Sequence, residues 1–180
     1  MPIELILGGA RSGKSAYAEQ QARESGCGVT VIVTAQPLDA EMAARIAHHR
    51  AQRAAHWRTV ETPLDLAAAL RTEAGDNRFV IVDCLTLWAS NHLCPPDLAE
   101  TDAPPDNWPA ARNELIDLLP RLPGRIALVS NEIGCGVVPL GAITRRFVDE
   151  AGRLNQALAQ RCDRVTLVAA GLPLRLKDRA

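Results

Sequence analysis

The sequence contains few aromatic residues and almost no net charge. Phenylalanine, tryptophan and tyrosine make up 3% of the 180 residues, and the formal net charge is −1 at pH 7. Few aromatic rings disfavour a surface on which single-stranded nucleic acid stacks its bases. Without excess positive charge, the chain has no overall electrostatic attraction for nucleic acid or an anionic membrane. No apolar run approaches the roughly 20 residues of a membrane-spanning helix. We therefore expect no nucleic-acid partner and no membrane span.

The cysteines form no C-x-x-C pair, and nothing at the start of the chain resembles a secretion signal. The five are Cys27, Cys84, Cys94, Cys135 and Cys162. An odd number of scattered cysteines without a secretion signal argues for free thiols rather than disulfides. No spacing among them favours a zinc site. We expect most of them to pack as small core side chains in a cytoplasmic protein.

A glycine-rich segment near the start carries a specific pattern. Residues 8–15, GGARSGKS, match G-x-x-x-x-G-K-[ST] between an apolar run at 3–7 and a stretch typical of a helix. A loop in that setting points backbone N–H groups at the phosphates of a nucleotide. Lys14 is expected to reach the β- and γ-phosphates, and the Ser15 hydroxyl to hold Mg²⁺. The residues predicted to bind the triphosphate are Gly8, Gly9, Ala10, Arg11, Ser12, Gly13, Lys14 and Ser15.

Apolar strands alternate with helical stretches along the chain. Strands are expected at 3–7, 28–34, 57–61, 78–83, 125–130 and 164–169, with a last edge strand at 172–176. Helices are expected from residue 15, at 39–55 with Asp39 as N-cap, at 63–73 with proline in the first turn, and at 85–93, 109–122 and 142–161. Residues 94–108 and 134–141 are expected to be loops. This order predicts an α/β P-loop fold, a mostly parallel sheet flanked by helices on both faces, in a single domain over residues 1–180.

Residues that end the strands are the candidates for function, because ligands of such sheets bind at the carboxyl ends of the strands. Asp83 closes the strand FVIVD, where P-loop proteins place an acid that contacts Mg²⁺ directly or through water. The alternative for Asp83 is an ordinary helix cap. Glu132, in SNEIG, is a second candidate, for which metal or substrate contact and simple turn chemistry are both open.

Two adjacent histidines lie in the predicted helix 39–55. Neighbours on a helix point about 100° apart, so at most one of them is well aimed at a given ligand. His49 shares a face with Met42, Ile46 and Arg53, whereas His48 lies nearer the solvated side. A neutral imidazole is a competent nucleophile toward phosphorus, but composition alone favours an ordinary exposed basic helix.

Several segments together resemble one enzyme family. They are GGARSGKS, DAEMAARIAHHRAQRAAHWRTVE, VDCLTLW, VSNEIGCGVVP and AGRLNQALA, spread over essentially the whole chain. In these segments the sequence resembles the bifunctional adenosylcobinamide kinase / adenosylcobinamide-phosphate guanylyltransferases of cobalamin biosynthesis. Many enzymes share the phosphate loop, but EMAARI followed by HHR and W-R-T-x-E is specific.

The resemblance implies two reactions on a RecA-like P-loop fold. In the first, ATP or GTP phosphorylates the terminal hydroxyl of the aminopropanol arm of adenosylcobinamide. In the second, GTP guanylylates a histidine with loss of pyrophosphate, and the GMP passes to adenosylcobinamide phosphate to give adenosylcobinamide-GDP. The resemblance also implies Mg²⁺ as a cofactor and a homotrimer.

The resemblance places the covalent nucleotide on the second histidine, His49, with His48 as the alternative if the alignment slips by one residue. It makes His49 and Lys14 the catalytic residues, and Ser15 and Asp83 the metal ligands. Beyond the phosphate loop, the nucleotide-binding residues that it implies are Val33, Thr34, Ala35, Arg50, Ala51, Gln52, Arg53, Glu61 and Asp83.

Two other interpretations share the phosphate loop. A single-function P-loop kinase of a small alcohol would need Asp83 but gives no reason for the HHR helix. A nucleotide-dependent regulatory protein would show no corrinoid turnover, and only the proline-rich stretch at 94–108 suits it.

Overall fold

The computed structural model describes residues 2–95 and 107–178, so most of the predicted loop at 94–108 lies outside the described residues. The strands are β1 (Ile3–Gly8), β2 (Gly28–Val33), β3 (Arg58–Glu61), β4 (Arg78–Asp83), β5 (Arg125–Asn131), β6 (Arg164–Ala169) and β7 (Leu172–Asp178). The helices are α1 (Lys14–Glu24), α2 (Ala40–Gln52), α3 (Leu66–Glu73), α4 (Leu85–Leu93), α5 (Trp108–Leu118), the 3₁₀ turn η1 (Leu119–Arg121) and α6 (Ala142–Arg161).

The strands form one sheet in the order β3-β2-β4-β5-β1-β6-β7. Every neighbouring pair is parallel except β6 and β7, which are antiparallel. The predicted mostly parallel α/β sheet with a final edge strand is therefore confirmed. Parallel strands place their carboxyl ends at one edge of the sheet, so the loop after β1 and the ends of β4 and β5 meet there.

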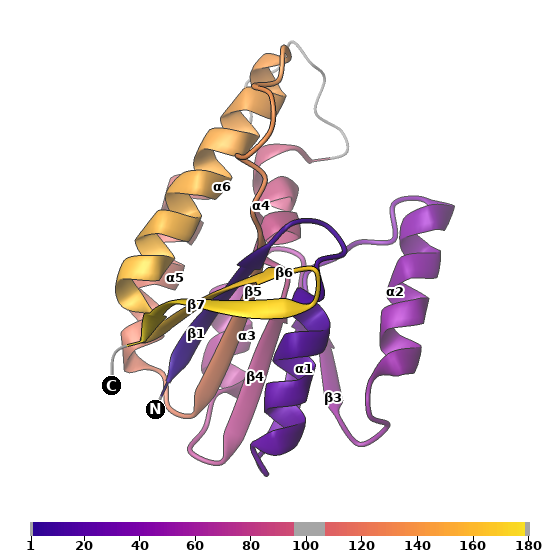
Figure 1. Ribbon diagram of the computed structural model, residues 1–180, viewed down its shortest axis with the longest axis vertical. Coiled ribbons are helices and arrows are strands. Elements are labelled where there is room, and N and C mark those ends of the chain that lie inside the picture. The colour runs from indigo at the N-terminus through magenta and orange to yellow at the C-terminus, as the bar shows by residue number, and fades with distance from the viewer. Residues whose placement is uncertain (1, 96–106, 179–180) are drawn as a thin grey trace.

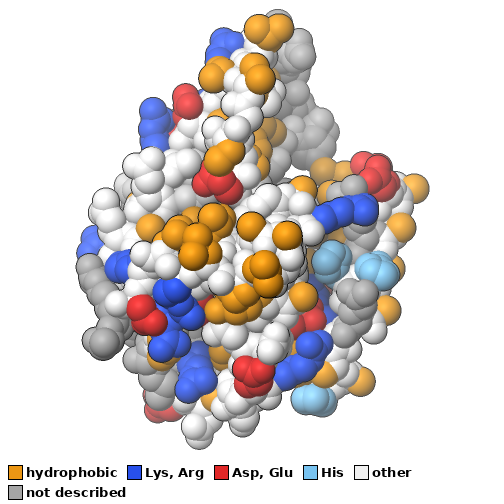
Figure 2. All heavy atoms as spheres, in the orientation of Figure 1, with side chains coloured by type: hydrophobic (Ala, Val, Ile, Leu, Met, Phe, Trp, Pro, Cys, Tyr) orange, Lys and Arg blue, Asp and Glu red, His pale blue; other side chains and the backbone are white. Residues whose placement is uncertain are grey.

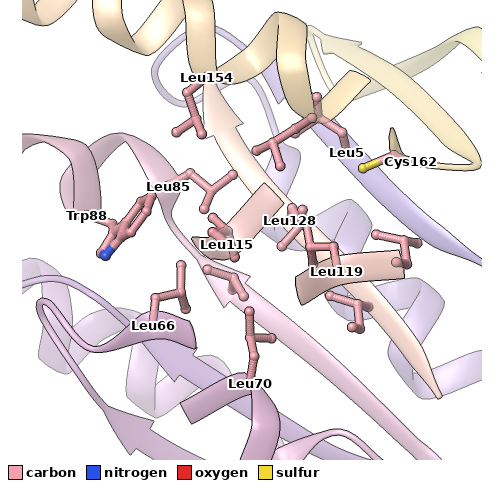
Figure 3. Close-up of a cluster of buried hydrophobic side chains, with 14 of the residues drawn as sticks. Leu5, Leu66, Leu70, Leu85, Trp88, Leu115, Leu119, Leu128, Leu154 and Cys162 are labelled. Carbon is pink, nitrogen blue, oxygen red and sulfur yellow. The ribbon is translucent and has the colours of Figure 1, made fainter. Parts of the chain in front are cut away.

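Helices cover both faces of the sheet (Figure 1). On one face α3, α4, α5 and α6 pack leucines against alternate residues of the strands, and Figure 3 shows this cluster. Its fully buried members include Leu66, Leu70, Leu85, Leu115, Leu119 and Leu128. Burying a leucine contributes about 1.5–3 kcal/mol, so this cluster is a principal source of stability. No helix in the described part of the chain is long and apolar enough to cross a membrane.

Helix α1 covers the other face through small side chains. Its Ala18 and Ala22 are buried against Val31, Ile81 and Val129 of the central strands. Because alanine occupies little space, the helix lies close to the sheet at the point where the phosphate loop leads into it. These small side chains therefore allow α1, which follows the phosphate loop, to pack against β2, β4 and β5.

Three helix boundaries differ from the sequence-based prediction by three residues or more. The helix expected at 63–73 begins at Leu66, because α4 holds the preceding segment: Trp88 Nε1 donates to the Leu64 carbonyl at 2.8 Å and Asn91 Nδ2 to the Pro63 carbonyl at 2.9 Å. The helix expected at 39–55 ends at Gln52, and the next residue is extended. The helix expected at 109–122 ends at Leu118 and continues as η1, because Pro120 has no N–H to donate.

Candidate active site

The phosphate loop needs glycine where the backbone approaches its neighbours. A Cβ on Gly8, whose φ is +156°, would lie 2.3 Å from the Val168 carbonyl oxygen of β6. Gly13 has a φ of +99°, and a Cβ there would meet Gly171 Cα at 3.1 Å. The Gly171 N–H also donates to the Ser12 carbonyl at 2.8 Å. The turn between β6 and β7 therefore braces the loop, a support that the sequence pattern does not reveal.

Lys14 begins α1 and is 7% exposed. Its Nζ donates to the Gly9 carbonyl at 2.6 Å, so the ammonium group lies across the loop. Burial lowers the pKa of Lys14 from its ordinary value, while the negative charge of Asp83 acts in the opposite direction. A phosphate bound at the start of α1 would add negative charge beside this cation, and the helix N-terminus favours an anion there as well.

Asp83 and Ser15 meet at the carboxyl end of β4. The Ser15 hydroxyl donates to Asp83 Oδ1 at 3.4 Å, and the Asp83 side chain is 18% exposed. One hydroxyl and one carboxylate suit Mg²⁺, which is held in nucleotide sites by one or two protein oxygens together with substrate phosphates. Of the described side chains, no group of three or more histidines, cysteines or acids could hold a metal. The pair therefore fits a magnesium ion that is shared with a nucleotide.

Helix α2 presents one face to a cavity of about 230 Å³ at the carboxyl ends of β2, β4 and β5. The helix starts where the Asp39 carboxylate accepts from the Met42 N–H at 2.6 Å, as predicted for an N-cap. The spacing of Met42, Ile46, His49 and Arg53 predicts a shared face, and all four line the cavity. Histidine side chains, in pale blue, gather at the surface on the α2 side of the molecule (Figure 2).

The cavity joins α2 to the phosphate loop and the strand ends. It is lined by Ser15, Val33, Ala35, Met42, Ile46, His49, Arg53, Asp83, Cys84, Leu87 and Asn131. Burial raises the pKa of the Cys84 thiol to about 11, and the nearby charge of Asp83 adds to the effect. Cys84 is therefore a protonated thiol at neutral pH and is not the nucleophile of the cavity.

An ion pair ties the end of α2 to β4. The Arg53 guanidinium lies 3.5 Å from Asp83 Oδ2, and the Arg53 side chain is 7% exposed. Its Nε has no hydrogen-bond partner among the residues that the structure describes. Arg53 also lines a second cavity of about 250 Å³ with Arg50 and Trp57. Two arginines beside an open space, one with an unpaired buried donor, suit a negatively charged ligand.

Some residues that the sequence nominates lie elsewhere. Thr34 is fully buried, and its hydroxyl donates to the Cys84 carbonyl at 2.7 Å, so its side chain braces the backbone instead of lining the cavity. Glu61 is the last residue of β3, and its exposed carboxylate lies 4.0 Å from the Arg50 guanidinium. The Glu132 carboxylate accepts from the Gly134 N–H at 2.9 Å, which favours turn chemistry over metal contact. Ala51 and Gln52 complete the last turn of α2.

Sequence reasoning missed two residues of the lining, Cys84 and Leu87, and it nominated Asn131 only as a strand-ending residue without a role. Asn131 ends a strand at the carboxyl edge, which is a usable signal, but its type points to no single role. Cys84 and Leu87 follow β4 at the start of α4 and are ordinary apolar positions in the sequence. Only the three-dimensional turn from β4 into α4 directs them at the cavity.

The phosphate loop and the mostly parallel α/β sheet define the class of fold as a P-loop fold of the RecA-like type. Among solved structures, an ATPase domain matches with a TM-score of 0.52 and 15% identity, covering 99% of this chain and 77% of the other. The RadB recombinase matches with a TM-score of 0.51 and 14% identity, and the match covers 92% of this chain and 73% of the recombinase chain. At these identities the likeness concerns the fold alone.

The sequence comparisons identify the family. The family model described as cobinamide kinase / cobinamide phosphate guanyltransferase matches residues 4–176. A bifunctional adenosylcobalamin biosynthesis protein, CobP of Pseudomonas aeruginosa, is 58% identical over 97% of this chain and 96% of its own length. The bifunctional adenosylcobalamin biosynthesis protein CobU of Escherichia coli is 41% identical over 96% of this chain and 98% of its own length. The chain belongs to the cobinamide kinase / cobinamide phosphate guanyltransferase family and is an enzyme.

Proposed function

We propose that this enzyme phosphorylates adenosylcobinamide with ATP or GTP and then transfers GMP from GTP to adenosylcobinamide phosphate through a guanylyl-histidine. One observation carries the proposal: His49 lines the same cavity as Ser15 and Asp83, so a nucleophile from α2 faces the phosphate loop. A plain kinase gives no reason for a histidine at that place. The proposal treats residues 1–180 as one catalytic domain.

In the kinase step, the terminal hydroxyl of adenosylcobinamide attacks the γ-phosphorus of the triphosphate. The new O–P bond forms as the bond to the β-phosphate oxygen breaks, and the hydroxyl proton leaves to solvent or a base. Lys14 and the N–H groups at the start of α1 bind the phosphate oxygens, on which negative charge collects. The Ser15 and Asp83 pair would hold Mg²⁺, which would neutralise charge on the phosphates.

In the guanylyl step, a ring nitrogen of neutral His49 attacks the α-phosphorus of GTP. An N–P bond forms, the bond to the β-phosphate breaks, pyrophosphate leaves, and the imidazolium then loses its proton. A phosphate oxygen of adenosylcobinamide phosphate next attacks the same phosphorus, the P–N bond breaks, and the histidine leaves as its ring takes back a proton. The covalent intermediate divides one displacement into two, each with its own alignment. Arg53, 7% exposed beside the cavity, would offset charge on the guanylyl phosphate.

We further propose that the enzyme works as a homotrimer in the cytoplasm. The outer edge of β7 ends the described sheet, and hydrophobic side chains gather over this strand in Figure 2. Leu172, Leu174 and Leu176 are exposed to 73%, 59% and 55%. An edge strand that also exposes apolar side chains favours pairing with another copy. Light scattering on Leu174→Glu beside the wild type tests this, and a monomeric wild type would contradict it.

Two assays on purified enzyme separate the proposal from the plain-kinase alternative. The first follows phosphorylation of adenosylcobinamide with ATP or GTP, and the second follows GMP transfer from GTP to adenosylcobinamide phosphate. We expect wild type and His48→Ala to perform both reactions, and His49→Ala to retain phosphorylation while losing transfer by more than about 10³-fold. Transfer that survives in His49→Ala would contradict the covalent route, and an enzyme that only phosphorylates would favour the plain kinase.

A further inference from the structure

Asn131 ends β5 on the wall of the cavity, and its backbone is fully engaged. Its N–H donates to Thr86 Oγ1 at 2.7 Å, and its carbonyl accepts from Asn155 Nδ2 at 3.2 Å. Within residues 2–95 and 107–178 no hydrogen bond reaches its side-chain amide, which lines the cavity with Ser15 and Asp83. A polar group held rigidly by its backbone and left open at a binding cavity is suited to contact a ligand.

We infer that the Asn131 amide donates a hydrogen bond to the terminal phosphate of the nucleoside triphosphate and so distinguishes triphosphate from diphosphate. The inference rests on the proposed function, because it presupposes that the phosphate loop holds a triphosphate. An amide N–H pointed at a phosphate oxygen makes a charge-assisted hydrogen bond, which is among the stronger kinds.

The register of the strands assigns Asn131 to the terminal phosphate. Asn131 pairs with Gly8, the first residue of the phosphate loop, and the next N–H, of Glu132, donates to the Gly8 carbonyl at 3.0 Å. In the sheet, β5 lies between β1, which leads into the loop, and β4, which ends at Asp83. Asn131 is therefore beside both the loop and the proposed magnesium pair, where a P-loop enzyme places the last phosphate.

The α-phosphate is expected to bind at the end of the cavity that lies opposite Asn131. His49 lies on α2, which connects β2 and β3 on the other side of β4 from β5. In the proposed reaction His49 must reach the α-phosphorus. A triphosphate that runs from α2 across the end of β4 presents its terminal phosphate to Asn131.

A buried polar network makes Thr86 and Asn155 positioning residues for Asn131. They are 7% and 6% exposed, and Asn155 Oδ1 accepts from the Ser130 hydroxyl at 2.7 Å. Thr86 lies in the first turn of α4 and Asn155 in α6, so helices on one face of the sheet fix the last residue of β5. Removing either partner leaves a partly buried backbone group of Asn131 unpaired and frees the residue to move.

Binding of the α,β-methylene analogues of GTP and GDP, with Mg²⁺, tests the inference. These analogues cannot guanylylate the protein, so titration calorimetry reports binding alone. We expect Asn131→Ala to weaken binding of the triphosphate analogue by about tenfold or more, and binding of the diphosphate analogue by less than about twofold. Asn131→Asp should weaken the triphosphate further, because its carboxylate repels phosphate. Asn113→Ala, an exposed asparagine on α5, is the matched control.

Equal weakening of both analogues by Asn131→Ala, or no weakening, would overturn the inference while the proposed function stands. A wild type that binds neither analogue would overturn the nucleotide site, and the inference with it. For the positioning residue, Thr86→Val should lower the triphosphate-to-diphosphate preference, and Thr86→Ser, which keeps the hydroxyl, should restore it. A purely structural role would change the melting temperature of Thr86→Val without changing that preference.

Discussion

The guanidinium of Arg53 lies 3.5 Å from the carboxylate of Asp83, although 30 residues separate them in the sequence. The pair links the end of α2 to the end of β4. Because both side chains are largely buried, at 7% and 18% exposed, the contact is shielded from solvent. It holds the helix that carries His49 against the strand end that is proposed to bind magnesium.

Replacing Arg53 should damage both stability and guanylyl transfer. Arg53→Met removes the cation and leaves Asp83 partly buried without its ion-pair partner. We expect the free energy of unfolding to fall by about 1–3 kcal/mol. The rate of guanylyl transfer should fall by about tenfold or more. Arg50→Met is the control for stability, since Arg50 faces Glu61 across an exposed 4.0 Å pair that contributes at most about 1 kcal/mol. Equal stability losses in the two variants, measured by urea unfolding, would contradict this account.

Gly8 should not accept a side chain. Gly8→Ala places its Cβ 2.3 Å from the Val168 carbonyl oxygen and 2.6 Å from Ser12 Oγ, so the loop must shift. We expect a loss of stability of about 1–3 kcal/mol together with weaker triphosphate binding. Gly9→Ala is the matched control for stability, since a Cβ there has no neighbour within 4 Å among the described residues. Equal melting temperatures of Gly8→Ala and Gly9→Ala would argue against the close approach of the Gly8 backbone to Val168.

Glu150 of α6 should make folding sensitive to acid. Burial opposes its ionisation, but hydrogen bonds from Trp108 and Arg153 and the charges of Arg112 and Arg153 outweigh burial and lower its pKa. A carboxyl whose pKa is lower in the folded state stabilises the fold above its unfolded value of 4.5, and that stability disappears as pH falls through the folded value. Glu150→Gln should therefore destabilise the protein at neutral pH.

The difference in unfolding free energy between wild type and Glu150→Gln should shrink as the pH falls below 4.5. Glu114→Gln, in a half-exposed pair with Arg71, should change stability little at any pH. Chemical denaturation at several pH values measures both variants. A Glu150→Gln difference that stays constant down to strong acid would show that the carboxylate charge is not the cause.

The cysteines should differ sharply in reactivity. Cys135 is exposed, whereas burial raises the pKa of Cys84 to about 11 and that of Cys162 to about 12. Because the thiolate is the reactive form, iodoacetamide at about pH 8 should modify Cys135 first and reach Cys84 and Cys162 only after unfolding. Peptide mass spectrometry gives the order. Early modification of Cys84 in folded enzyme would contradict its assignment as an inert thiol.

Most of the fold could be predicted because local pattern and tertiary structure agree. Apolar runs such as 78–83 are buried on both faces of a parallel sheet, and the phosphate loop requires a strand before it and a helix after it. The helix boundary at Pro63 could not be predicted, since it depends on hydrogen bonds from Trp88 and Asn91 of α4. These residues are close only after the chain has folded.

The candidate site also has features that local sequence predicts and features that only the tertiary fold shows. Helical spacing is a local property, so it predicts that His49 and Arg53 share a face. Strand order is not local, so the sequence could not show that Asn131 pairs with Gly8 or that Gly171 braces the phosphate loop. The strand-end position of Thr34 predicts a contact with the nucleotide, but its hydroxyl bonds to the backbone of Cys84. A position at the carboxyl edge does not settle which way a side chain points.

Mass spectrometry of the enzyme after exposure to GTP tests whether a covalent guanylyl group forms on His49. Wild type, His49→Ala and His48→Ala are incubated with GTP and Mg²⁺ without a cobinamide acceptor, kept from acid because a phosphoramidate is acid-labile, and digested. We predict one GMP residue on His49 in wild type and in His48→Ala, and none in His49→Ala. A GMP on His48 or another residue, or none on folded wild type, would contradict it.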